Sequence, residues 1–241
     1  MSLPINSQPY YYDLHIHTAL SPCANDDMTP NDIVGMAILN GLDIIAITDH
    51  NSIANAHSVM EAARVANAQH GTNLIVLPGV EVSTAEEVHV LCLFNSIEKA
   101  QLFEAELEYF FNTIKNREDV FGTQNLLDSN DNITGTVERM LIAPSLISFD
   151  HLHQVVQKYG GAFIPAHIDK DSFSVTSNLG FLPPHLDINT IEIFSESESV
   201  NYPDKKIIYS SDAHQLWAIN EKKHYLTLPE LSAKAVINAL L

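Results

Sequence analysis

The sequence has little of what would place the chain outside a reducing compartment or in a membrane. Its two cysteines, Cys23 and Cys92, are too few for a disulfide framework. No apolar run approaches the roughly 18 residues that a membrane span needs. The opening MSLPINSQPY has no basic region followed by an apolar core. These absences predict a cytoplasmic protein with no membrane partner.

Basic residues are also scarce. The 241 residues include 12 lysines and arginines against 30 acidic residues, for a formal net charge of −18. Because affinity for a nucleic-acid backbone comes chiefly from basic side chains that neutralise phosphates, we expect no long nucleic acid as a partner. A short oligonucleotide stays open. The carboxylates and 12 histidines suit bound cations, although an acidic surface also simply favours solubility. Nothing in the sequence indicates the oligomeric state.

Short apolar runs alternate with amphipathic stretches, a pattern typical of βα units and a parallel sheet. The predicted strands are 10–16, 42–48, 73–78, 87–94, 160–167, 188–194 and 205–214. The predicted helices are 29–41, 52–70, 97–116 and 229–240. No linker or repeat divides the chain, so we expect one domain over 1–241. The pattern weakens after residue 117, which predicts an insertion around 99–148 that covers the pocket.

The first predicted strand carries two histidines near its end, in the stretch YYDLHIHTAL. Because residues i and i+2 of a strand point to the same side, His15 and His17 can bind one metal ion together. A second pair, His151 and His153, has the same spacing, but the apolar residues around it recur at helical intervals. A helix separates such a pair, so we expect no metal there.

Four further segments place ligand-type residues near the ends of predicted strands. They contribute Asp49, His50, Glu81, His89, His167, Asp212 and His214. In a barrel of parallel strands the carboxyl ends converge on one rim, where active sites form. Imidazoles mixed with carboxylates suit zinc, manganese or iron. Since one catalytic ion takes about three protein ligands, the set predicts two or three divalent ions that share a bridging carboxylate.

The motifs DLHIHT, TDHNS, GVEVSTAEEVHVL, AH and SSDAH, in this order, resemble those of the PHP (polymerase and histidinol phosphatase) family of metal-dependent phosphoesterases. The resemblance extends from about residue 11 to 215. It implies an α/β fold, a distorted (β/α)7 TIM-like barrel with a trinuclear metal site at the carboxyl ends of its strands.

By position, the resemblance also implies which residues hold each ion. The sets are His15, His17, Glu81 and Asp212 for the first ion, Glu81, His89 and His167 for the second, and His50 and His214 for the third. Asp49 would lie beside the third ion as a partner or ligand. Many relatives have a further histidine or aspartate ligand where this chain has Cys23. Three alternatives stay open: Cys23 binds as thiolate, Asp26 or Asp27 replaces it, or the third site is weak or empty.

Such a centre is suited to hydrolysis of phosphate esters, because neighbouring ions acidify a bridging water and clamp the phosphoryl oxygens. We expect a phosphatase that uses a metal-bridging hydroxide on a small phosphorylated metabolite or nucleotide. Asp49, His50 and Glu81 are the predicted catalytic residues, and Lys170 is a candidate phosphate contact. The alternatives are a phosphodiesterase or exonuclease on short nucleotides, cleavage of an amide bond, and a regulatory metal-bound module without activity.

Overall fold

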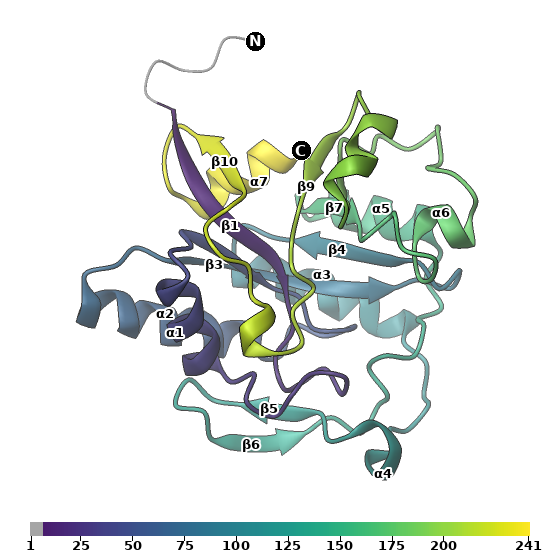
Figure 1. The fold of residues 1–241 in the computed structure, drawn as a ribbon. Helices are drawn as coiled ribbons and strands as arrows, with labels where there is room; N and C mark the ends of the chain where they lie inside the picture. Colours follow the sequence, from purple (N-terminus) through teal and green to yellow (C-terminus); the bar gives the residue numbers. More distant parts are fainter. Residues whose placement is uncertain (1–6) are drawn as a thin grey trace.

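The computed structural model of the chain describes residues 7–241. The prediction about the start of the chain falls mostly on residues 1–6, which lie outside the described residues. The main sheet has six strands in the order β10-β1-β2-β3-β4-β7 (Figure 1). Their bounds are β1 Gln8–Ile16, β2 Ile44–Ile47, β3 Ile75–Ser83, β4 His89–Leu93, β7 Ala162–Pro165 and β10 Tyr225–Leu228.

The centre of this sheet is parallel and covered on both sides. β2 pairs in parallel with β1 and with β3, and all four of its residues are buried. Ile45 and Ile47 pack into one apolar cluster, whereas Ile44 and Ala46 pack into another. A continuous apolar run of this kind is what a strand buried on both faces requires. The core therefore fixes the central strands whose ends carry the ligand-type residues.

The fourth strand departs from the parallel sheet that the sequence predicts. β4 runs antiparallel to both β3 and β7. Its connection from β3 spans only residues 84–88, and a parallel crossover needs a dozen residues or more. β3 and β4 also approach closely at Gly79, where an added Cβ would lie 2.6 Å from a Leu93 methyl group. This glycine lets the two strands pack two residues before Glu81.

The sheet curls, and its far edges approach each other through two shorter strands. β8, Thr190–Glu192, and β9, Lys206–Ile208, form a separate parallel pair. The Ile168 amide donates to the Glu192 carbonyl at 2.9 Å, which joins β8 to the segment after β7. On the other side, the Ala213 amide donates to the His15 carbonyl at 3.1 Å. The chain therefore has an α/β fold with a curled sheet that brings distant segments beside β1.

Five helices cover the sheet: α1 Pro30–Leu39, α2 Ala56–His70, α3 Ile97–Leu107, α5 Phe149–Lys158 and α7 Ala233–Leu240 (Figure 1). Thr29 caps α1 by accepting from the Asp32 amide, as the sequence predicts. The predicted helix 97–116 is too long, because α3 ends at Leu107 and a single 3-10 turn, η1 Glu108–Phe110, follows it. There the Asn112 side chain accepts from the Ile114 amide at 3.0 Å. Such local side-chain bonds compete with helical ones.

The segment 99–148 that the sequence assigns to an insertion begins within α3, and after η1 it contains a short helix and a hairpin. These are α4 Glu118–Phe121, β5 Asn125–Leu127 and β6 Ile133–Thr136. They lie at the bottom of Figure 1, apart from the main sheet. The segment bonds to the loop after β2, since the Asn51 side chain donates to the Leu141 carbonyl at 2.7 Å and Asn55 donates to that of Asn125 at 3.0 Å.

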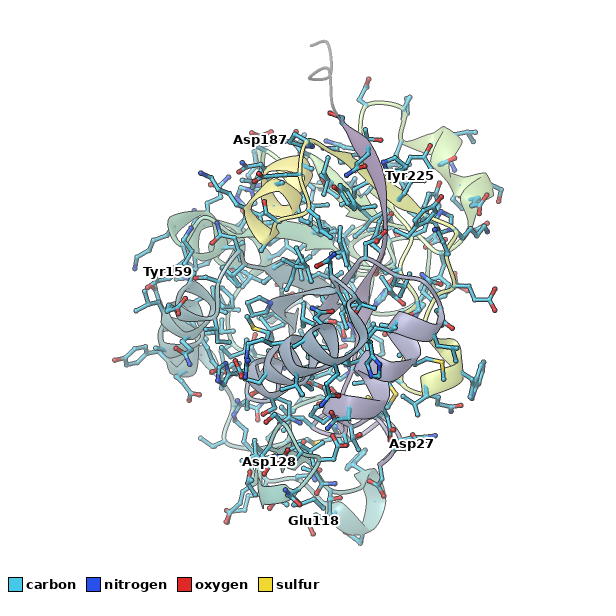
Figure 2. All side chains as sticks on the ribbon, turned by 90° about the vertical axis from the view of Figure 1, so that its left-hand side faces the viewer. Asp27, Glu118, Asp128, Tyr159, Asp187 and Tyr225 are labelled. Atoms are coloured by element: carbon cyan, nitrogen blue, oxygen red, sulfur yellow. The ribbon has the colours of Figure 1, made fainter. Side chains whose placement is uncertain are left out.

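Three short elements complete the fold: α6 Val175–Asn178, η2 Glu196–Asn201 and η3 Leu216–Ala218. Side chains fill the space between sheet and helices (Figure 2). Within residues 7–241, no helix combines the length and the apolar character needed to cross a membrane.

Candidate metal centre

The end of β1 brings two imidazoles to one carboxylate. His15 and His17 are fully buried, and their ring centroids lie 5.2 Å apart. The Nε2 atom of each lies 3.3 Å from Oδ1 of Asp212. This common direction is what the alternation of side chains along a strand predicts. The pairing of β1 with β2 shifts register between Asp13 and Ile16, an irregularity of the kind that re-aims side chains beside active sites.

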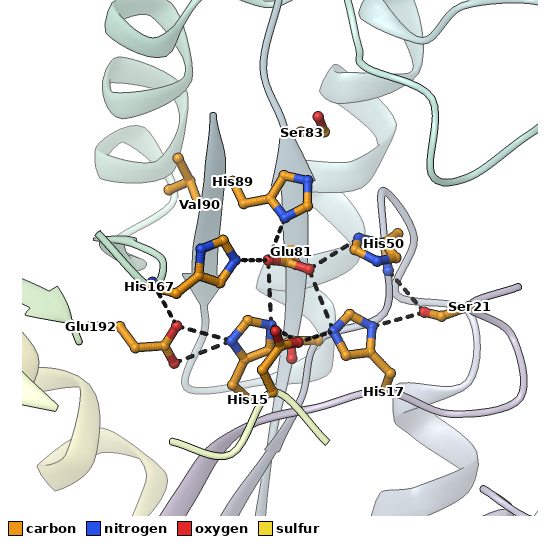
Figure 3. A network of polar contacts seen from close by, with 12 residues as sticks. His15, His17, Ser21, His50, Glu81, Ser83, His89, Val90, His167 and Glu192 are labelled. Atoms are coloured by element: carbon orange, nitrogen blue, oxygen red, sulfur yellow. Dashed lines mark hydrogen bonds and ion pairs between the residues drawn. The ribbon is translucent and has the colours of Figure 1, made fainter. Parts of the chain in front are cut away.

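Glu81, on β3, stands at the middle of the cluster (Figure 3). Its carboxylate lies within 3.4 Å of imidazole nitrogens from five histidines: His15, His89 and His167 on Oε1, and His17 and His50 on Oε2. These histidines come from four different parts of the sequence. One buried carboxylate therefore links the ends of β1, β2, β4 and β7.

Asp212 and His214 close the cluster from the segment after β9. The His214 ring stacks on that of His17, with centroids 4.1 Å apart, and its Nδ1 bonds to the Asp212 carbonyl at 2.9 Å. Two residues of the cluster have left-handed backbones, His167 with φ 31° and Asp212 with φ 52°. Non-glycine residues with positive φ are uncommon and gather at functional sites, where surrounding structure holds the strain.

The charges of the cluster depend strongly on one another. Burial raises the pKa of Glu81, but the neighbouring imidazoles outweigh it and hold that pKa well below its usual range. Burial lowers the pKa of His17 and of His50, but the nearby carboxylates outweigh it and raise each pKa to about 9. For His214, burial and the neighbouring His17 lower the pKa to about 3. Without a bound cation, the carboxylates therefore favour the protonated forms of His17 and His50.

The cluster fits a divalent transition metal. Three groups bring ligand atoms within 4.8 Å of one another: His15, His17, Glu81 and Asp212; His50, Glu81 and His89; and His17, His50 and His214. Nε2 of His15, Nε2 of His17 and Nδ1 of His50 are buried and make no hydrogen bond of good geometry. The oxygens of Glu81 and Asp212 that lie 3.0–3.4 Å from these nitrogens are in position to share an ion with them. Buried polar atoms rarely stay unpaired, and a bound ion is one explanation. Imidazole and carboxylate donors suit zinc, manganese or iron.

Glu192, at the end of β8, belongs to the cluster although the sequence pattern does not predict it. Its carboxylate is fully buried, and both of its oxygens lie 3.1 Å from Nδ1 of His15 (Figure 3). It also accepts from the His167 amide at 2.9 Å. A carboxylate on the second ring nitrogen fixes the tautomer and orientation of a metal-binding histidine. The available signal was an acidic residue inside the buried run INTIEIF.

Asp49 lies behind the cluster. Its carboxylate accepts from the Thr18 amide at 2.7 Å, the Thr18 hydroxyl at 2.8 Å and the Ser21 hydroxyl at 2.7 Å. Ser21 in turn bonds to Nδ1 of His17 at 2.9 Å. With its oxygens occupied in this way, Asp49 can orient His17 through Ser21.

The alternatives around Cys23 lie on the loop after β1. Cys23, Asp26 and Asp27 are exposed, and among the described residues none of the three belongs to a group with metal-binding geometry. The Cys23 thiol does lie beside His50, whose pKa it helps to raise. Lys170 lies at the edge of the cluster, with Nζ 2.8 Å from Oδ2 of Asp212.

The cluster opens into a small cavity of about 150 Å³, which His50, Glu81 and Lys170 help to line. In a sequence comparison, the model of the PHP domain matches residues 13–173, about two thirds of the chain. The chain belongs to the PHP domain family. Its family is one of metal-dependent phosphoesterases, and the cluster described here has the residues to hold such metals.

Among curated proteins, this PHP domain is similar to the 5'-3' exoribonuclease Rnm of Salmonella typhimurium, with 38% identity over 78 residues. That alignment covers 32% of this chain and 24% of the relative, so the chain matches about a quarter of the relative's length. Endonuclease Q of Pyrococcus furiosus has a similar fold, with a TM-score of 0.67 and 15% identity over 97% of this chain and 56% of that one.

A second endonuclease Q structure aligns with a TM-score of 0.59 and 16% identity, over 87% of this chain and 50% of that one, and contains a 27-mer duplex with an abasic lesion. These similarities contradict the expectation that a long nucleic acid is not a partner, and that expectation is wrong. It rested on net charge, which describes the average surface. Bound cations and a few lysines set the local field at a site.

Proposed function

We propose that this PHP domain is a metal-dependent phosphodiesterase that hydrolyses a nucleic-acid strand from its end, RNA by analogy with the exoribonuclease relatives. The observation that carries the proposal is Glu81, one buried carboxylate in contact with five imidazoles. This arrangement suits two or more ions that share a ligand. Similarity to exoribonucleases over a third of the chain supports the substrate class.

We assign the metal ligands as the sequence predicts: His15, His17, His50, Glu81, His89, His167, Asp212 and His214. When bound, divalent ions supply an acidified water nucleophile and neutralise the phosphoryl oxygens. The protein's own contribution is to hold these ligands in place, with Glu192 orienting His15 and the pair Asp49 and Ser21 orienting His17. This is a positioning role for Asp49 in place of direct contact with the substrate.

Lys170 is the candidate contact for a phosphate oxygen. Its ammonium lines the cavity and has Asp212 as its ion-pair partner, 2.8 Å away. A lysine acts on phosphate as a movable point charge. We propose that Lys170 shares its ammonium between Asp212 and a phosphate oxygen. His50 also lines the cavity, and we propose it, rather than Asp49, as the residue nearest the leaving group.

The cavity favours the end of a strand over its middle. At about 150 Å³ it is smaller than the roughly 300–1,000 Å³ of typical ligand pockets, so it suits a phosphate group and little more. The Asn125 amide also donates to the Ala19 carbonyl, in the loop after β1, at 2.9 Å. We propose that segment 99–148, through its bonds to the loops after β1 and β2, limits access to this cavity. The same small volume favours a second candidate, release of phosphate from a phosphomonoester.

The deciding experiment compares products. A 3'-labelled single-stranded RNA of about ten nucleotides, the matched DNA and a panel of phosphomonoesters are incubated with the protein and Mn²⁺ or Zn²⁺. Matched samples contain a chelator. We expect stepwise release of mononucleotides from RNA, abolished by the chelator.

Inorganic phosphate from the monoester panel, with intact RNA, would replace the nuclease proposal with the phosphatase. Cleavage of DNA in preference to RNA would change the substrate and keep the reaction. If neither phosphate nor nucleotides are released with either metal, both proposals fail and a regulatory metal-bound module is the better interpretation.

A further inference from the structure

Phe173 is a partly exposed aromatic residue that lines the metal cavity. Its ring lies on the His89 imidazole, with centroids 4.9 Å apart and planes inclined by 19°. Nδ1 of His89 lies 2.9 Å from Glu81. Only one side chain therefore separates the Phe173 ring from the middle of the cluster, yet 47% of Phe173 remains exposed.

The backbone of Phe173 adopts a strained conformation. Phe173 has φ 55°, a conformation that bulky side chains rarely adopt. Its carbonyl accepts from the His89 amide at 2.9 Å, and the next residue, Ser174, is buried and donates to the Lys170 carbonyl at 2.7 Å. Strain that persists because neighbours enforce it is most common at ligand sites. An ordinary surface phenylalanine has no need of it.

We propose that the Phe173 ring is a stacking surface for the nucleobase of the nucleotide whose phosphate enters the metal cluster. This inference rests on the proposed nuclease function and names how that site recognises its substrate. Lys170 also lines this cavity. The flat Phe173 ring then matches the base of one nucleotide. The Lys170 ammonium and the metal-binding cluster match the phosphate of that nucleotide. Stacking of this kind accepts every base, because each base has a π face.

Two substitutions of Phe173 and one control substitution elsewhere separate stacking from packing. Phe173→Leu keeps an apolar side chain of similar size and loses the flat ring, whereas Phe173→Tyr keeps the ring. Tyr225→Ala is the control, because Tyr225 is 56% exposed and is not among the residues that line the cavity. Thermal midpoints measured beforehand show whether each variant is folded.

The kinetic test uses two single-stranded RNA substrates that differ only in whether the terminal nucleotide has its base. Removing one stacking partner raises KM by roughly 5- to 150-fold. We expect this rise for Phe173→Leu on the normal RNA, little change on the abasic one, and near wild-type values for Phe173→Tyr and Tyr225→Ala. An equal loss on both substrates, or no loss on either, would overturn the stacking surface without touching the nuclease proposal.

A binding test covers the case in which no strand is cleaved. The fluorescence of 2-aminopurine falls when it stacks, so 2-aminopurine ribonucleotide 5'-phosphate is titrated with the Mn²⁺-loaded protein. Quenching that Phe173→Leu abolishes and Phe173→Tyr retains supports stacking even if the nuclease proposal fails. Identical quenching in the wild type and Phe173→Leu would refute it.

Discussion

Two His-x-His sequences occur in this chain, and they fold into opposite situations. His15 and His17 lie near the end of β1 and face the same carboxylate, Asp212. His151 and His153 lie on α5, where His151 is exposed and packs edge-on against Phe110, whereas His153 is buried. The same spacing therefore gives a candidate metal site on a strand and ordinary packing on a helix.

The difference shows that spacing acquires meaning only from the backbone that carries it. Successive residues alternate sides in a strand, so i and i+2 coincide. In a helix each residue turns about 100°, so the same two positions point about 200° apart. Ligand-type residues from other elements must also converge. Glu81 and Asp212 do so at the end of β1, whereas His153 has polar contacts with the Asp187 carbonyl and the Gln157 side chain.

The largest expected effect comes from removing a ligand on the β1 side of the comparison. His17→Ala and Asp212→Ala should each abolish tight metal binding and lower turnover more than about 100-fold, because loss of even an indirect partner of a ligand costs roughly 10- to 100-fold. Metal content by elemental analysis, paired with RNA hydrolysis, checks this. A His17→Ala protein with full metal content and activity would sink the assignment of the centre.

The next largest effect is expected from Glu192→Gln. This change tests whether His15, of the His15–His17 pair, needs the Glu192 carboxylate on its second ring nitrogen to bind metal. Glutamine keeps the volume but replaces the carboxylate on Nδ1 of His15. We expect metal affinity to fall roughly 10- to 100-fold, with activity restored at saturating metal. Titration with Co²⁺, whose visible spectrum reports ligand geometry, measures this. Unchanged affinity together with an unchanged spectrum would mean that Glu192 only packs.

The sequence predicted much of the cluster because those residues lie within or shortly after recognisable strands, as His17 does after β1 and His50 after β2. Glu192 escaped detection because its role depends on β8 meeting β1 and β7, and nothing local to INTIEIF indicates that meeting. Likewise, the antiparallel direction of β4 follows from the length of a loop, and β5 and β6, with three and four residues, are too short to show an alternating pattern. Local periodicity predicts individual helices and strands well, but it does not indicate which of them contact each other.

An effect of intermediate size is expected from pH, which should change the thermal midpoint through His17 and its neighbour His50. In the metal-free protein the pKa values of His17 and His50 are about 9, above the usual 6.5. A raised folded pKa adds stability that is complete below about pH 6.5 and is lost as pH rises through 9. The thermal midpoint in chelator should therefore fall between pH 6.5 and 9, while metal affinity rises because ligands must lose protons. A midpoint that does not vary over this range contradicts the charge coupling.

The smallest effect is expected on the helical side, from His153→Ala. This change removes an edge-on contact with Phe163, at 4.9 Å, and a 3.3 Å contact with the Asp187 carbonyl. Each contact is worth about 1 kcal/mol, so the thermal midpoint should fall by several degrees. Metal content and RNA hydrolysis should stay at wild-type values, since among the described residues His153 belongs to no metal-binding group. Loss of metal from this variant would contradict the interpretation that only the strand pair, His15 and His17, binds metal.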